Sequence, residues 1–452
     1  MIVRSAVAVA GLLVFGSTFA FFPPLAGLAL LAFSAATYWR PEVGLSLVFL
    51  VVPFELVRPL PGDVFVSFSE FMLAGSAVAF FWRRPDWLDW DWRPLIWWTP
   101  FLGAILLSGL INIEWYKVLP HVLRNCELAL MAVLALNVYR SGSGRRRWVH
   151  LAAGAALLFQ GLLAVVQQLS EGAFGTRAVG TFSNPNQMGG FMALATVTAL
   201  ALWLVTQDAA KGELMVHAKR VLGLGALAGL LGLLLSASRS ALASASGGAL
   251  VTLAGLWRVG LAQSASKRLG LRRIVLVLTS LLLLTVVFAQ LPLFQPAYRT
   301  LSERVGPGLY AAAEKRLSFF EAGFKVWSSN PLLGVGPGRW REEALAHDVL
   351  ADPALDESIL AHPHNLLLQV GALFGLLGVL GLLYAGVRYA LFFRVSSSPF
   401  ALAGWAFLAV FVVNNLADSL YPSLAVETGW FLGALAAFAA NRHADAALHS
   451  QA

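Results

Sequence analysis

The sequence predicts an all-α integral membrane protein with roughly 12 to 14 transmembrane helices. Of its 452 residues, 58% are hydrophobic and only 12% are charged, which is about half the charged fraction of a soluble domain. Apolar runs also follow one another along most of the chain, separated by short polar turns. One long and more polar segment, residues 295–364, interrupts this pattern and is expected to lie outside the membrane.

Each apolar run is judged against the roughly 20 residues that a helix needs to cross a bilayer. The first run, up to Phe22, resembles a signal peptide, but more runs follow at once after Pro24, so we interpret it as the first membrane helix. Prolines close to the short early runs also allow re-entrant or interfacial segments. The candidate helices lie at residues 4–22, 25–39, 43–57, 66–82, 95–112, 121–139, 148–169, 186–206, 221–236, 240–258, 273–293, 365–393, 400–416 and 424–440.

The charge distribution predicts the orientation of these helices. With the N-terminus inside, the inner segments contain 20 of the 32 basic residues but only 7 of the 24 acidic residues. The formal net charge of +8 is therefore a topology signal, and nucleic-acid binding is not needed to explain it. The single cysteine, Cys126, excludes an intrachain disulfide and a cysteine-based metal cluster.

This topology divides the chain into transmembrane helices at 1–294, an outer loop domain at 295–364 and further transmembrane helices at 365–452. A loop of this length is expected to have structure or a function of its own. Apolar residues at near-helical spacing between Tyr310 and Trp327 predict an amphipathic helix that ends before Pro331 and could lie on the outer membrane surface.

The strongest candidate for chemistry is His362-Pro363-His364-Asn365, where the outer loop enters an apolar helix. Histidine can take or give a proton near neutral pH. We favour a general base over a metal ligand, because no metal-binding spacing such as H-E-x-x-H is present. A metal site would need a third ligand, for which Asp352, Asp356 and Glu357 are the candidates.

Arginines on the predicted outer face could bind an anion. Arg239 lies between two apolar runs with almost no loop, where it is either an anion clamp or a side chain that snorkels to the headgroups. Arg177 lies in a polar turn in which Asn184 and Asn186 are plausible helix caps, and an ordinary capped loop is the alternative.

Two further arginines are weaker candidates. Arg124 has Glu127 three residues later and His121 three residues earlier, and a structural ion pair with Glu127 is the simpler interpretation. Arg339 follows the glycine-rich turn Gly334–Gly338, which could present backbone N–H groups to an anion. The turn lacks a following Lys-Ser/Thr, so it is not a nucleotide-binding P-loop, and a plain turn is the simpler interpretation.

Together, arginines and a histidine pair on one outer face suit a lipid-borne anionic substrate such as a pyrophosphate. The region 177–380 also resembles the O-antigen ligase and polymerase superfamily of bacterial inner membranes. The resemblance rests on Gly180-Thr-Phe-Ser-Asn-Pro-Asn-Gln-Met-Gly189, Ser238-Arg-Ser-Ala241, Arg316 with Trp327, Pro331-Leu-Leu-Gly-Val-Gly-Pro-Gly338, His362-Pro-His-Asn365, Gly371 and Gly375-Leu-Leu-Gly378.

The resemblance implies a metal-independent glycosyltransferase without a cofactor, whose site faces the periplasm. The donor would be a glycan on undecaprenyl pyrophosphate, and the acceptor a sugar hydroxyl of lipid A core for a ligase or another lipid-linked glycan for a polymerase. It implies that His364 is the base, with His362 as its orienting partner or as the base itself. Arg239 and Arg316 would bind the pyrophosphate, with Arg177 as a weaker third. Asn365, Asn184, Asn186, Arg124 and Arg339 are possible supporting residues.

A transporter or flippase of lipid-linked saccharides is the alternative from another class. It would need polar residues through the bilayer, but most charges lie at helix ends, and no inverted repeat is visible. A purely structural scaffold would not explain His364, Arg239 and Arg316 on one face. We therefore expect a multi-pass inner-membrane ligase, in contact with membrane lipids and without nucleic acid, before a polymerase.

Overall fold

Within the part of the chain that the structure describes, the protein is a helical bundle with one small hairpin. The computed structural model describes residues 24–51, 57–60, 64–83, 89–112, 115–140, 145–170, 177–206, 213–262, 299, 302–303, 308–346, 362–396, 398–419 and 423–440. Its first elements are α2 (Pro24–Trp39), α3 (Pro41–Val51), β1 (Val57–Leu60), β2 (Val64–Ser67), α4 (Phe68–Arg83), α5 (Arg93–Asn112), α6 (Trp115–Arg140) and α7 (Arg146–Ser170). They are followed by α8 (Pro185–Val205), α9 (Glu213–Ser236), α10 (Arg239–Ala262), α13 (Gly308–Ser329), α14 (Trp340–Ala346), α15 (Leu366–Val395), α16 (Ala401–Ala417) and α17 (Ala425–Ala439).

These helices confirm the predicted all-α membrane class. Seven helices among the described residues are long and apolar enough to cross a membrane, namely those at 93–112, 117–140, 146–170, 185–205, 215–236, 239–258 and 366–395. Shorter apolar helices at 26–39, 41–51, 401–417 and 425–439 accompany them. The candidate spans at 4–22 and 273–293 lie outside the described residues, and every other candidate overlaps with a helix. The chain is therefore a multi-pass membrane protein.

The connection between α3 and α4 differs from the expected continuation of a helix to residue 57. Helix α3 ends at Val51, two residues before Pro53, which cannot continue the backbone hydrogen-bond ladder. Strands β1 and β2 then pair antiparallel, with Val57 opposite Ser67.

Small residues allow the membrane helices to approach each other closely. A Cβ on Gly161 of α7 would lie 2.3 Å from the carbonyl oxygen of Ala228 on α9. A Cβ on Gly433 of α17 would lie equally close, at 2.3 Å, to the carbonyl oxygen of Ala132 on α6. Because the bilayer gives no hydrophobic drive for helix association, this backbone-to-backbone packing is what holds such helices together.

Helix α15 is broken at Gly375, whose φ of 65° and ψ of −164° are not helical. The turn that follows α13 fills the break: the N–H groups of Val335 and Gly336 donate to the carbonyls of Ala372 and Leu373 over 2.8 and 3.0 Å. In return, the N–H of Leu376 donates to the carbonyl of Pro331 over 2.8 Å. Backbone groups that the break leaves without helical partners are thus satisfied, as they must be in an apolar environment.

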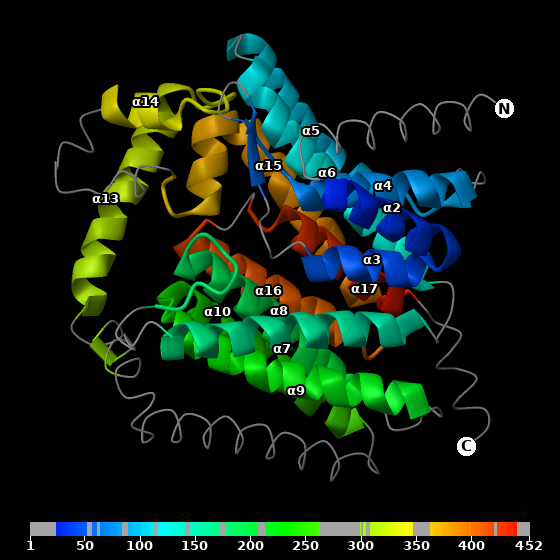
Figure 1. Cartoon of the computed structure of the whole chain (residues 1–452). Coiled ribbons are helices and arrows are strands. Elements are labelled where there is room, and N and C mark those ends of the chain that lie inside the picture. Colours follow the sequence, from blue (N-terminus) through cyan, green and yellow to red (C-terminus); the bar gives the residue numbers. More distant parts are fainter. Residues whose placement is uncertain are drawn as a thin grey trace.

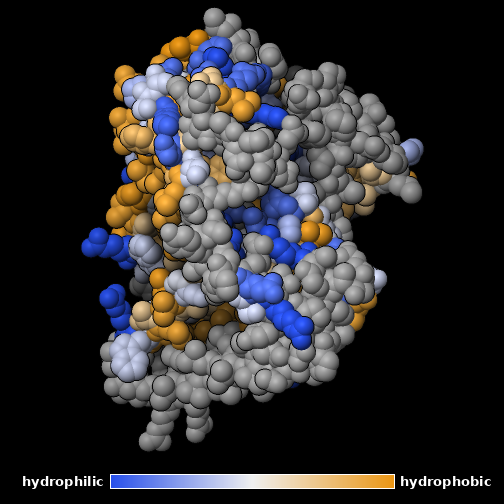
Figure 2. Space-filling model, turned by 90° about the vertical axis from the view of Figure 1, so that its left-hand side faces the viewer, coloured by the Kyte–Doolittle hydropathy of each residue, from blue (hydrophilic) through white to orange (hydrophobic). Residues whose placement is uncertain are grey.

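The amphipathic helix predicted in the outer loop is α13, which ends at Ser329, just before Pro331. It crosses one end of the bundle, where it runs past the ends of other helices (Figure 1). It packs on the first half of α15, with Trp327 against Gly371, where a Cβ would lie 2.5 Å from the indole ring. Seen from this end, hydrophilic side chains gather in the middle of the face (Figure 2).

Candidate active site

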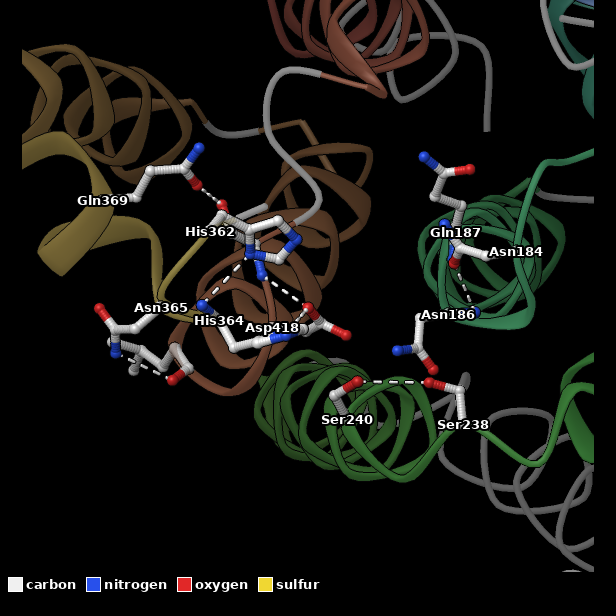
Figure 3. A network of polar contacts seen from close by, with 12 residues as sticks. Asn184, Asn186, Gln187, Ser238, Ser240, His362, His364, Asn365, Gln369 and Asp418 are labelled. Carbon is white, nitrogen blue, oxygen red and sulfur yellow. Dashed lines mark hydrogen bonds and ion pairs between the residues drawn. The ribbon is translucent and has the colours of Figure 1, made fainter. Parts of the chain in front are cut away.

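Four helix ends meet at the end of the bundle that α13 crosses. Helices α8, α10 and α15 begin there, at Pro185, Arg239 and Leu366, and α16 ends there, at Ala417. Their polar side chains face a common space (Figure 3). One side carries His362, His364 and Asp418, and the other side carries Asn184, Asn186, Gln187, Ser238 and Ser240.

His364 and Asp418 form a hydrogen-bonded pair at this space. Nδ1 of His364 lies 2.9 Å from Oδ1 of Asp418. The His364 side chain is 18% exposed, whereas that of Asp418 is 4% exposed. The imidazole can therefore be reached from outside, while the carboxylate that holds it is covered. Such an arrangement fixes the ring and leaves its other nitrogen, Nε2, for proton transfer.

His362 forms a hydrogen bond with the backbone of His364. Its Nδ1 accepts a hydrogen bond of 3.2 Å from the backbone N–H of His364. His364 has a φ of +52°, a left-handed conformation that is uncommon for a residue with a side chain. Burial, and then the charge of His364, lower the pKa of His362 to about 4. A neutral His362 ring can keep its Nδ1 as an acceptor at neutral pH.

Asp418 is the residue of this candidate site that the sequence interpretation missed. Although burial opposes its ionisation, the hydrogen bond and charge of His364, with the charges of His362 and Arg316, hold the pKa of Asp418 below its usual value. It caps the C-terminus of α16, where it is an isolated charge just after an apolar helix. This isolated charge at the end of an apolar helix was the sequence signal that could have identified Asp418. The acidic residues considered as third metal ligands, Asp352, Asp356 and Glu357, lie outside the described residues.

Asn365 and Pro363 set the position of the histidines. Asn365 is the N-cap of α15: its Oδ1 accepts the N–H of Leu368 over 3.0 Å. Its Nδ2 also donates to the carbonyl of Leu416 over 2.9 Å, which ties the start of α15 to the end of α16. Pro363 is buried against Gly323 of α13. The loop is therefore held by three helices.

On the opposite side, Arg177 joins the start of α8 to the end of α9. Its Nε donates to the carbonyl of Ser236 over 2.8 Å, and its Nη2 donates to Oδ1 of Asn186 over 2.5 Å. The predicted cap is also present, since Oδ1 of Asn184 accepts the N–H groups of Asn186 and Gln187. These contacts orient Asn186 toward the common space (Figure 3).

The two arginines predicted to bind pyrophosphate lie on different elements. Arg239 is the first residue of α10, where Oγ of Ser238 and Oγ of Ser240 lie 3.3 Å apart. Arg316 lies on α13, and its charge acts on Asp418. The tertiary structure thus brings Arg316 to the histidine pair from a helix that begins more than 50 positions earlier in the chain.

Arg124 has a different partner from the one expected. Its Nη2 lies 3.0 Å from Oε1 of Glu70, at the start of α4, instead of forming the expected ion pair with Glu127. Glu127 still interacts electrostatically with Arg124. His121 packs its ring 5.7 Å from that of Phe374. The pairing of Arg124 with Glu70 depends on how α6 packs against α4, and the spacing of residues along α6 does not reveal that packing.

The glycine-rich turn and Arg339 have structural roles. The N–H groups of Val335 and Gly336 are bonded to α15, which supports the plain-turn interpretation over an anion cradle. Arg339 pairs with Glu343, with 2.8 Å between Nη2 and Oε1, at the start of α14. A Cβ at Gly338 would lie 2.7 Å from the side chain of Lys117, so the turn packs tightly on α6.

Comparison with known proteins gives one match. Residues 224–383 match the family model for O-antigen ligase. The matched region includes Arg239, Arg316 and His364, whereas Asp418 and Arg177 lie beyond it. No match was found among curated proteins. Residues 224–383 of the chain are thus similar to O-antigen ligases, which agrees with the resemblance seen in the sequence motifs.

Proposed function

We propose that this protein is an O-antigen ligase, a glycosyltransferase that moves a glycan from undecaprenyl pyrophosphate to a sugar hydroxyl of lipid A core. The observation that carries the proposal is the pair formed by the partly exposed His364 and the buried Asp418, at the end of the bundle that α13 crosses. The O-antigen ligase match over residues 224–383 supports the same assignment.

In the proposed reaction, His364 is the general base. The acceptor hydroxyl oxygen attacks the anomeric carbon of the donor glycan and forms the new glycosidic bond. The bond from that carbon to the pyrophosphate oxygen breaks, and the pyrophosphate leaves with its electron pair. Nε2 of His364 takes the hydroxyl proton, and the Asp418 carboxylate at Nδ1 stabilises the imidazolium that forms. No metal or cofactor takes part in this scheme.

The leaving pyrophosphate needs positive charge close to the base. We assign Arg239 and Arg316 to this role, because Arg239 begins α10 between Ser238 and Ser240, and the charge of Arg316 on α13 acts on Asp418. A guanidinium offers several donors to phosphate oxygens and stays charged at any relevant pH. Donors already in place around a developing charge are a large contribution to catalysis.

Arg177 receives a different role from the pyrophosphate contact expected from the sequence. Its Nε and Nη2 are committed to Ser236 and Asn186. We therefore assign it to holding the start of α8 to the end of α9, just before α10, so that Asn186, Ser238 and Ser240 keep their positions beside the substrate. Asn365 and Asn184 serve as caps of the helices that carry the site.

The site is assigned to the periplasmic face of the inner membrane, with a cytoplasmic N-terminus. Support comes from the charge distribution, since the basic residues concentrate at the helix ends opposite to the site. In this orientation both lipid-linked substrates could enter sideways between helices, in contact with membrane lipids.

A reconstituted transfer assay tests the proposal. Purified protein is mixed with undecaprenyl-pyrophosphate-linked glycan, with and without lipid A core, and products are separated on a gel. We expect product only with lipid A core. His364→Ala and Asp418→Asn are expected to lower the rate by about 10²–10⁴-fold, the usual contribution of a positioned base. His217→Ala, an exposed histidine on α9, is the matched control.

Each other outcome has a definite meaning. A ladder of longer lipid-linked glycan without lipid A core would assign a polymerase with the same chemistry. Transfer near the wild-type rate by folded His364→Ala protein would reject the assignment of His364 as the general base. Absence of transfer in every mixture, with movement of donor across vesicles, would favour a transporter.

A further inference from the structure

The two histidines and Asp418 lie close enough together to bind one ion. A ligand atom from each of His362, His364 and Asp418 lies within 4.8 Å of the other two. The ligand atoms of a tetrahedral zinc ion are about 3.3 Å apart, given bonds of about 2.0–2.1 Å. Side-chain rotations that move the ligand atoms by about an ångström would therefore let all three bind one ion.

A second observation at this cluster also points to a ligand. Asp418 Oδ2 is buried and has no hydrogen-bond partner among the described residues, although Oδ1 of the same carboxylate is bonded to His364 and to the N–H of Ser419. The carboxylate points toward the common space (Figure 3). A buried carboxylate oxygen without a partner costs free energy that a bound cation would recover.

We propose that His362, His364 and Asp418 form a binding site for a divalent transition-metal ion such as Zn²⁺, which inhibits glycan transfer by occupying the base. The binding goes beyond the proposed function, whereas the inhibition rests on it. An ion bonded to His364 removes the nitrogen lone pair that would accept the acceptor proton, so transfer stops while the ion is bound.

The ligand set selects the class of metal. Two imidazoles and one carboxylate suit Zn²⁺ or Cu²⁺, whereas Mg²⁺ and Ca²⁺ prefer all-oxygen sites. The nearby charge of Arg316, which acts on Asp418, opposes cations in general. Affinity must therefore come from bonds to imidazole nitrogen, which hard cations form poorly. We expect Mg²⁺ at the same concentration to leave transfer unchanged.

The site also depends on a residue next to the base. His364 and Asp418 alone supply two ligands, which rarely hold zinc, and His362 supplies the third. His362→Asn separates binding from folding, because the amide oxygen of Asn can still accept the His364 N–H as in an Asx turn, but it is a poor zinc ligand.

Direct binding is measured first, on full-length protein without an affinity tag of histidines. Competition with a chromophoric chelator is expected to give one Zn²⁺ per wild-type chain. His362→Asn and Asp418→Asn are expected to weaken binding at least about tenfold, since even the loss of groups that only orient ligands weakens metal sites by that much. His217→Ala, outside the cluster, should bind like the wild type.

Transfer is then measured with and without the same Zn²⁺ concentration. Wild-type transfer should fall and recover on addition of chelator, whereas the transfer that remains in His362→Asn should not respond to Zn²⁺. Absence of Zn²⁺ binding, or equal binding by all four proteins, would overturn the metal site and leave the proposed base untouched. Transfer that requires Zn²⁺ would instead overturn inhibition and the metal-free scheme together. Transfer near the wild-type rate by His364→Ala would reject the assignment of His364 as the base, but it would not affect the measurement of Zn²⁺ binding.

Discussion

His364 owes its position to two neighbours that act on different atoms. Asp418 holds the imidazole through Nδ1, and His362 holds the backbone through the His364 N–H. The left-handed φ of His364 costs on the order of 1–3 kcal/mol, so the local contacts must stabilise it. This makes His362 a positioning residue in the proposed reaction, with a role distinct from that of the base.

This role predicts different effects for two substitutions of His362. His362→Ala removes the acceptor for the His364 N–H, and we expect kcat to fall by about 10–100-fold with KM nearly unchanged, because small misplacements of a catalytic group have effects of that size. His362→Asn keeps an acceptor at the same place and is expected to stay within about fivefold of wild type, since a neutral hydrogen bond contributes about 1 kcal/mol. Steady-state transfer kinetics measure both.

The same pair of variants tests the alternative in which His362 is the base. In that case neither Ala nor Asn could accept a proton, and both variants would lose transfer equally. Rescue by Asn alone would therefore favour the positioning role.

Among the elements, the joint between α15 and the turn after α13 determines where the outer loop sits. The turn inserts its backbone into the break at Gly375, and Trp327 packs on Gly371 one turn earlier in α15. A Cβ at Gly375 would lie 2.2 Å from the carbonyl of Leu332. Both the positive φ and this contact require glycine at that position.

Gly375→Ala is expected to destabilise the protein and to lower transfer. The backbone conformation alone should cost about 1–3 kcal/mol, and the contact with Leu332 adds to it. Gly386→Ala is the matched control in the same helix, because nothing lies within 4 Å of its added Cβ. It should be neutral or up to about 1 kcal/mol more stable. Thermal unfolding of both variants and the wild type in detergent measures the difference in stability. Equal midpoints for the two variants would contradict the requirement for glycine at position 375.

At the scale of the whole molecule, the site lies at one end of a bundle whose opposite end is rich in arginine. Arg394 lies at the last turn of α15, whose first turn is at the site, and Arg93 lies 5.1 Å from the ring of Phe392 near that last turn. Arg140 and Arg93 both pair with Asp91. This asymmetry is the basis for assigning the site to the periplasm. That residues 295–364 act as a separate loop domain stays a prediction.

Cysteine accessibility tests the orientation. In a Cys126→Ala background, Ser328→Cys on α13 is expected to react with a membrane-impermeant maleimide in intact cells with a permeable outer membrane. Arg258→Cys, exposed near the end of α10, should react only after the inner membrane is opened. Reaction of Arg258→Cys alone in intact cells would reverse the assigned topology.

The sequence by itself determined the membrane class, the bounds of most helices, the amphipathic α13 and the histidine pair. These follow from hydropathy, periodicity and local turn residues, which act between neighbours along the chain. Only the tertiary structure decided that Asp418 meets His364 from 54 positions away, that Arg124 pairs with Glu70, and that Arg177 joins the start of α8 to the end of α9. Such pairings depend on which helix faces pack together, and close contacts at small residues fix those faces in three dimensions.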